Sequence, residues 1–117
     1  MLTIIRFFIK HFNDREFIAS RQFLATDAWR KVRNSARVKN RRQYGKLTCE
    51  ACGLSDGSAL CADHILPRKH YPRMALFGFN LQMLCDDCNR VKGSEYTDDF
   101  RSSFRYPLAV LLVWILR

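Results

Sequence analysis

Two pairs of cysteines share the same short spacing in this 117-residue chain. Cys49 and Cys52 form one Cys-x-x-Cys pair, and Cys85 and Cys88 form the other. Two intervening residues let both thiolates of a pair reach one ion at about 2.3 Å, and two such pairs complete the tetrahedral shell of zinc. Buried thiols without a metal are the alternative, but they do not explain the repeated spacing. The pattern predicts a structural zinc site, which has no open position at which to activate water.

Any reaction therefore needs a second group of side chains, and the candidates lie between or beside the cysteine pairs. They are Asp63, His64, Asn80 and Asn89. A neutral imidazole, with a pKa near ~6.5, can take a proton from water at physiological pH. A hard divalent ion on an Asp and an Asn oxygen would stabilise the charge that develops on phosphate and leaving oxygen. Phosphodiester hydrolysis requires both. An Asp63–His64 pair that only caps a hairpin is the alternative.

The elements that must position these residues form a strand, loop, strand and helix unit. We expect short strands over "ALCADHI", residues 59–65, and "NLQMLC", residues 80–85, and a short helix within "CDDCNRVKG", residues 85–93. Neighbouring residues on a regular strand point to opposite faces, so Asp63 and His64 can serve one site only if the strand ends or twists there. Pro67 favours such an ending. Cys61 has no partner at metal spacing and is assigned to packing.

Helices are expected ahead of this unit. Apolar residues at helical spacing predict an amphipathic helix over residues 2–12. A second helix should begin after a Thr26 cap, end at Gly45 and carry a thin apolar stripe of Trp29, Val32 and Ala36. The tail "PLAVLLVWIL", residues 107–116, is too short to cross a bilayer, which takes about 20 residues. We expect it to be a buried strand or helix, or a dimer contact.

The charge distribution favours a polyanionic partner. The chain has 20 Lys and Arg against 11 Asp and Glu, a net charge of +9, and the entire excess lies within residues 1–46. A solvated charged face is the alternative for the basic helix. The five cysteines are an odd number, and "MLTIIRFFIK" lacks the pattern of a signal peptide, so we expect reduced thiols and a cytoplasmic protein.

Four separated stretches resemble the small HNH endonucleases, especially those of phages and prophages. The stretches are "CEACG", "ADHILPRKHYP", "NLQMLCDDCNRVKG" and "TDDFR", and they follow the order of the family over residues 44–101. The fold of that family is a ββα-metal finger. The basic helix also resembles the family's usual leader, whereas the apolar segments at the two ends of the chain do not.

The resemblance implies a role for each candidate residue. His64 would be the general base, and Asn80 would orient it through its side-chain carbonyl. Asp63 and Asn89 would hold one catalytic divalent cation, such as Mg²⁺ or Mn²⁺. The four cysteines match the zinc-binding members of the family. The nucleic-acid-binding candidates are basic residues of the leader helix and of the segments flanking the site: Arg30, Lys31, Arg33, Arg37, Arg41, Arg42, Arg68, Lys69, Arg90 and Lys92.

The sequence thus predicts an α+β fold: a ββα-metal finger stapled by a four-cysteine zinc site and preceded by basic helices. Its expected segments are an amphipathic helical segment at 1–25, a basic helix at 26–46, the nuclease domain at 47–101 and an apolar segment at 102–117.

The predicted function is metal-dependent endonucleolytic cleavage of DNA, by nicking or double-strand cutting, with weak sequence preference. A homodimer and phage packaging proteins are further partners in this interpretation, and membrane binding is not expected. The alternative function is a zinc-stabilised nucleic-acid-binding module without catalytic activity.

Overall fold

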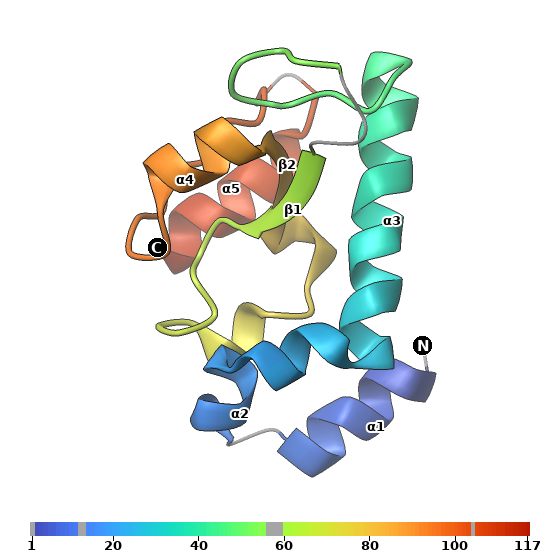
Figure 1. Cartoon of the computed structure of the whole chain (residues 1–117), viewed down its shortest axis with the longest axis vertical. Coiled ribbons are helices and arrows are strands. Elements are labelled where there is room, and N and C mark those ends of the chain that lie inside the picture. Colours follow the sequence, from blue (N-terminus) through green and yellow to red (C-terminus); the bar gives the residue numbers. More distant parts are fainter. Residues whose placement is uncertain (1, 12–13, 56–59, 104) are drawn as a thin grey trace.

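A computed structural model describes residues 2–11, 14–55, 60–103 and 105–117 of the chain. Helices surround a small two-stranded sheet, as Figure 1 shows, so the fold is α+β as predicted. The elements follow in the order α1 (Leu2–His11), α2 (Arg15–Ala19), a 3-10 helix (Arg21–Ala25), α3 (Asp27–Tyr44), β1 (Leu60–His64), two 3-10 turns (Pro72–Met74 and Gly78–Asn80), β2 (Leu81–Cys85), α4 (Asp86–Lys92) and α5 (Pro107–Leu116).

The strands β1 and β2 pair in antiparallel register, from Leu60 opposite Cys85 to His64 opposite Leu81. The predicted strands and the helix after them are confirmed, although residue 59 of the first stretch lies outside the described residues. Helix α4 ends at Gly93, which has a φ of 71°. Glycine adopts this left-handed region without the steric cost that a Cβ would bring.

Helix α3 begins and ends where its capping residues predict. The Thr26 hydroxyl oxygen accepts a hydrogen bond from the N–H of Trp29. At the other end Gly45 takes a φ of 80°, and its N–H donates to the carbonyl oxygen of Arg41. Both contacts satisfy backbone groups that a helix end leaves without partners. Trp29 and Val32 are buried along α3, as the apolar stripe predicts.

The sheet lies between two helices, α3 on one face and α4 on the other (Figure 1). His64 of β1 stacks on Trp29 of α3, whereas Asp63 contacts Lys92 of α4. This is the alternation that a regular strand imposes on neighbouring residues. Strand β1 ends at His64, so the expected ending near Pro67 is also confirmed.

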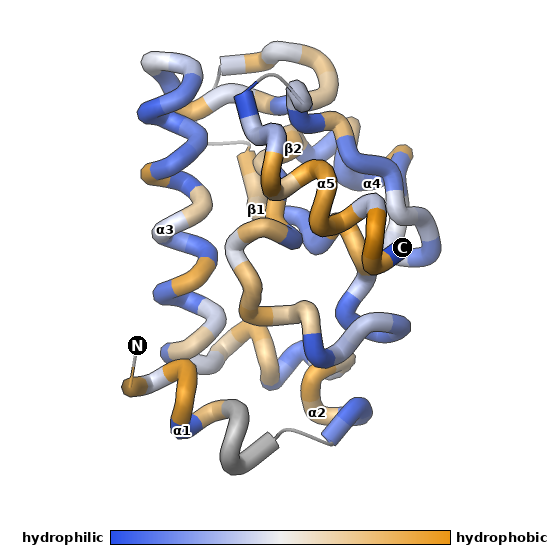
Figure 2. Tube along the Cα trace, turned by 180° about the vertical axis from the view of Figure 1, so that it is seen from behind, coloured by the Kyte–Doolittle hydropathy of each residue, from blue (hydrophilic) through white to orange (hydrophobic). Residues whose placement is uncertain are grey.

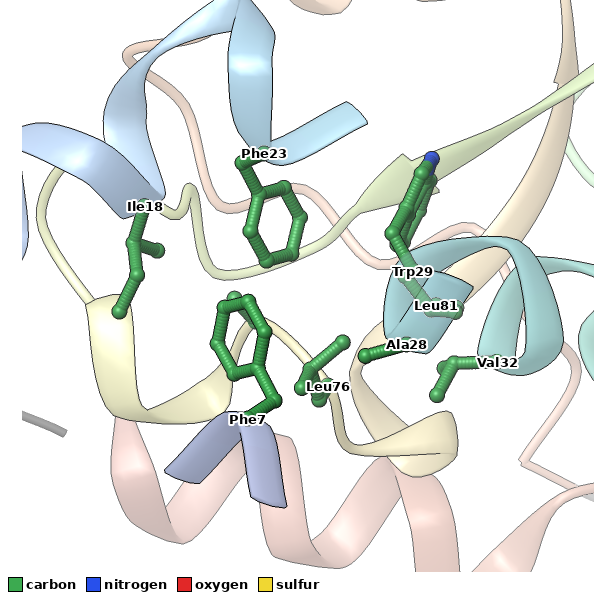
Figure 3. Close-up of a cluster of buried hydrophobic side chains, with 9 residues drawn as sticks. Phe7, Ile18, Phe23, Ala28, Trp29, Val32, Leu76 and Leu81 are labelled. Atoms are coloured by element: carbon green, nitrogen blue, oxygen red, sulfur yellow. The ribbon is translucent and has the colours of Figure 1, made fainter. Parts of the chain in front are cut away.

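The main hydrophobic core joins the N-terminal helices to the strand, loop, strand and helix unit. Figure 3 shows Phe7 of α1, Phe23 of the first 3-10 helix and Trp29 of α3 in one cluster with Leu76 and Leu81. Phe23 has no exposed surface, and its ring makes an edge contact with Phe7. The described residues of the N-terminal helices therefore share one core with β2 and the loop before it. Helix α1 is present as predicted, but position 12 lies outside the described residues.

Helix α5 differs from its prediction in one respect. The segment is a helix, yet only Val113 is buried, against Ile65 and Leu66. Leu108 and Trp114 are 67% and 68% exposed, and the expected burial of this segment within the chain is wrong. Figure 2 shows its apolar residues as an orange stretch. Apolar residues occur on all sides of α5, so its one contact with the domain covers only part of its apolar surface. No helix among the described residues is both long and apolar enough to span a membrane.

Candidate functional site

The four predicted zinc ligands form one cluster. The sulfur atoms of Cys49, Cys52, Cys85 and Cys88 all lie within 4.8 Å of one another, and those of Cys52 and Cys85 are 3.7 Å apart. Two sulfurs bound tetrahedrally at about 2.3 Å from one ion would be about 3.8 Å apart. The spacing and the donor chemistry therefore fit a structural zinc ion. This cluster is the only such group of three or more metal-binding His, Cys, Asp and Glu side chains within the described residues.

The cluster connects two parts of the chain that are far apart in sequence. Cys49 and Cys52 belong to the turn after α3, whereas Cys85 ends β2 and Cys88 lies in α4. Burial raises the pKa of the Cys49 thiol, but backbone N–H groups, that of Cys52 first, outweigh burial and lower it to about 7. A thiol that ionises near neutral pH is a better metal ligand. An ion here would hold the turn after α3 against the junction of β2 and α4.

His64 is held by a backbone carbonyl and by an aromatic ring. Its Nε2 lies 2.8 Å from the carbonyl oxygen of Ala75, and its ring stacks on Trp29 with centroids 4.7 Å apart and planes 26° apart. A carbonyl oxygen only accepts, so this contact assigns the proton of the neutral ring to Nε2. Nδ1 then keeps its lone pair and is the nitrogen that can accept a proton.

Burial first, and then the positive charges of Arg68 and Lys92, lower the pKa of His64 to about 4 against the opposing effect of the Ala75 hydrogen bond. The side chain is therefore neutral at pH 7 and has the protonation state of a general base.

Asp63 is held on the opposite face of β1 by two buried side chains. Its Oδ2 accepts a hydrogen bond of 2.9 Å from Gln82, the residue opposite it in β2. Lys92 of α4 lies 3.2 Å from the same oxygen, and its Nζ also donates to the carbonyl oxygen of His64. Burial raises the pKa of Asp63, while Gln82 and Lys92 act to lower it. The side chain of Lys92 is only 1% exposed, so the pair is an internal ion pair.

An open cavity of about 500 Å³ brings three of the predicted catalytic residues together. Asp63, His64 and Asn89 all line it, with Lys69 and Ser94 at another part of its wall. The Asn89 side-chain N–H donates to the sulfur of Cys61 at 3.4 Å. With its nitrogen committed to Cys61, the amide has its oxygen left as an acceptor. Cys61 is thus a partner of a site residue as well as a packing residue.

Asn80 does not contact His64 through its side chain. The carboxamide is fully buried, and its oxygen accepts from the N–H of Leu66 at 2.8 Å. Its nitrogen donates to the carbonyl oxygens of Leu66 and Met74. These bonds hold the loop between β1 and β2 in place. Met74 immediately precedes Ala75, whose carbonyl binds His64. Asn80 therefore acts on the imidazole only indirectly, by holding the backbone next to that carbonyl.

The basic residues flanking the site are already engaged within the chain. Arg68 donates to the carbonyl oxygens of Ile18 and Ser20. Lys69 pairs with Glu95 at 3.1 Å, and Arg90 pairs with Asp87. Lys92 is buried against Asp63. Among these four, Lys69 and Arg90 are exposed enough for a phosphate to reach without opening the protein.

The basic residues of α3 fall into two groups. Arg30 pairs with Asp27, and Lys31 donates to the hydroxyl of Thr3. Arg37 donates one N–H to the carbonyl oxygen of Leu60 at 3.2 Å. Of the other three candidates on this helix, Arg33 is half-buried, and Arg41 and Arg42 are exposed at the C-terminal end.

Sequence reasoning did not identify two residues that position the site. Gln82 is 1% exposed and joins Asp63 to the backbone of residues 98 and 100. Its signal was a polar residue inside an otherwise apolar strand. Trp29 was expected only as part of an apolar stripe, and no periodicity could reveal that its ring packs on His64. His70, in the loop after β1, is hydrogen-bonded to Glu95.

Comparison with known proteins gives one match. The family model described as HNH endonuclease matches residues 49–95, which include both cysteine pairs and all four candidate catalytic residues. No curated protein and no solved structure matches the chain significantly.

We expect zinc to hold the hairpin and α4 together. Replacement of Cys85 by Ser should remove the metal and lower the melting temperature, because a metal that binds only the folded chain contributes its binding energy to folding. Metal analysis and thermal unfolding measure both effects. Cys61→Ser is the matched control and should keep one zinc per chain. Stoichiometric zinc in Cys85→Ser would contradict the assignment.

Lys92→Met should destabilise the protein by about 3 kcal/mol at pH 7, because it leaves the Asp63 carboxylate buried without its cation. The double variant Lys92→Met/Asp63→Asn removes the stranded charge and should recover much of that loss. Urea unfolding of the wild type, the single variant and the double variant measures the difference. A double variant as unstable as Lys92→Met would show that the ion pair is not the cause.

His64 should make the protein less stable in acid. The folded state holds this ring neutral down to about pH 4, whereas the unfolded chain binds a proton near ~6.5. Stability should therefore fall as pH drops through this window, by up to about 1.4 kcal/mol per pH unit. Urea unfolding of wild type and His64→Gln at pH 7, 6 and 5 tests this, since the variant lacks the titrating ring. A stability difference that does not change with pH would refute it.

Proposed function

We propose that this chain is a metal-dependent endonuclease that hydrolyses phosphodiester bonds in DNA, because the HNH endonuclease family model matches residues 49–95. The observation that carries the proposal is the setting of His64. Its Nε2 is bound to the Ala75 carbonyl, and the residue lines a cavity shared with Asp63 and Asn89. A nuclease-type domain supplies the reaction class, and this cavity supplies groups suited to it.

In this proposal His64 removes a proton from the attacking water. The Ala75 hydrogen bond leaves Nδ1 as the free acceptor, and stacking on Trp29 restrains rotation of the ring. A positioned general base typically contributes about 10²–10⁴-fold to a rate. Asn80 contributes by fixing the loop that carries the Ala75 carbonyl, so we propose it as a positioning residue.

Asp63 and Asn89 are the residues that would hold a catalytic divalent cation. They fit this role because the oxygen of the Asn89 amide is left free by its contact to Cys61, and because Asp63 offers a carboxylate with lone pairs beyond those used by Gln82 and Lys92. Mg²⁺ or Mn²⁺ bound there would supply positive charge to the phosphate and its leaving oxygen. Lys92 and Gln82 keep Asp63 in place for this purpose.

DNA is the proposed substrate on grounds of charge. The excess of +9 lies in residues 1–46, and phosphate contacts of this kind give affinity with little sequence preference and a strong dependence on salt. One such site per chain would nick one strand, and double-strand cutting would need a second copy or a second visit. A homodimer, phage origin and packaging partners remain predictions from the resemblance alone.

The proposal is tested by replacing His64 with Ala and incubating supercoiled plasmid with Mg²⁺ or Mn²⁺. We expect cleavage to fall by at least about 10²-fold, while zinc content and DNA binding are retained. His70→Ala is the matched control, because this exposed histidine bonds only to Glu95 and does not line the cavity.

Two outcomes would overturn the proposal. If wild-type protein leaves the plasmid intact over a wide concentration range, the chain is better described as a zinc-stabilised nucleic-acid-binding module. If His64→Ala and His70→Ala cleave equally well, an activity is present but His64 is not its base.

A further inference from the structure

The cavity beside His64 continues into a second one along α3. The second cavity has a volume of about 470 Å³, and Arg33, Arg37 and Cys61 lie in its wall. The two cavities share four lining residues, namely Leu24, Trp29, Ala62 and Asn89. They are therefore two parts of one groove, with His64 and Asp63 in one part and two arginines in the other.

We propose that this groove is the track of the cleaved DNA strand, and that Arg33 and Arg37 bind its phosphates next to the one attacked. The inference rests on the proposed function and deepens it, because it selects two of the ten basic candidates as the ones that deliver the strand to His64. Positions four apart lie on one side of a helix with side chains about 5–6 Å apart, so both guanidinium groups face the same groove.

The two arginines have guanidinium donors left over for a phosphate. Arg37 uses one N–H to bind the Leu60 carbonyl, which fixes its side chain along the start of β1 and leaves its other donors for a ligand. Arg33 makes no hydrogen bond or ion pair within the described part of the chain. Guanidinium groups bind phosphate with two parallel hydrogen bonds, which suits a site that must hold a strand in register.

Four other basic residues of α3 are less suited. Arg30 and Lys31 already bind Asp27 and Thr3. Lys39 and Arg42 line a third open cavity, whose wall, among the described residues, meets that of the groove at Asn34 alone. With about 3.6 residues per turn, positions 39 and 42 lie on the opposite side of α3 from positions 33 and 37. A strand bound there would not reach His64.

The test compares two variants that remove the same charge from opposite sides of one helix. Arg33→Gln/Arg37→Gln removes two positive charges from the groove. Lys39→Gln/Arg42→Gln removes two from the other side. Binding of a short fluorescent DNA duplex is measured by anisotropy without added divalent ions, at several salt concentrations.

The groove variant should bind about tenfold more weakly, and the slope of log K against log salt should shrink by about two. The control variant should lose less affinity than the groove variant, because its two charges lie outside the proposed strand contacts. Equal losses in the two variants, or a larger loss in the control, would overturn the groove. Melting temperatures of both variants are measured alongside, so that a loss through unfolding is recognised, and Arg33→Gln alone then serves as the test.

Failure of the proposed function gives a different result. If wild type does not cleave plasmid but the groove variant alone loses affinity, the nuclease assignment fails and the groove stands as a DNA-binding surface. If wild type cleaves but the two variants bind and cleave alike, the groove assignment fails and the nuclease stands.

Discussion

The alternation of side chains along β1 is the constraint on which the site depends. Asp63 and His64 are neighbours, so a regular strand sends them to opposite faces, and each needs its own supporting wall. Helix α3 supplies Trp29 behind the imidazole, and α4 supplies Lys92 beside the carboxylate. The two walls are far apart in the sequence. The small sheet serves mainly as the partition between them, and the strand ends at His64 so that both residues can border one cavity.

Support for the site comes from buried polar groups more than from apolar packing. Three buried polar residues, each at most 3% exposed, provide this support: Gln82, Asn80 and Lys92. Gln82 and Lys92 bind Asp63, whereas Asn80 binds the loop whose Ala75 carbonyl contacts His64. Buried polar groups are costly unless every one of them is satisfied. No buried side-chain nitrogen or oxygen among the described residues lacks a hydrogen-bond partner. Such a network specifies one arrangement of side chains, because any other arrangement would leave a buried donor or charge without a partner.

Local signals in the sequence identify much of this fold, and long-range contacts explain what they miss. Cysteine spacing, the Thr26 cap and Gly45 each act over a few residues, so their consequences can be read directly from the chain. The stacking of Trp29 on His64 joins residues 35 positions apart, and no local pattern encodes it. Arg68 illustrates the same limit: its charge suggests a phosphate ligand, yet it binds two carbonyl oxygens near α2. The exposure of α5 is likewise set by long-range packing, because only Val113 of this helix is buried against the rest of the protein.

The order of the elements along the chain has a consequence for synthesis on the ribosome. The arginines of α3 emerge before either cysteine pair, and 33 residues separate Cys52 from Cys85. At about 5–20 residues per second, that interval lasts roughly 2–7 seconds. During this interval the nascent polypeptide carries the cationic helix α3 but lacks Cys85, Cys88 and the rest of α4. A newly made molecule can therefore associate with polyanions, ribosomal RNA among them, before its candidate site is assembled.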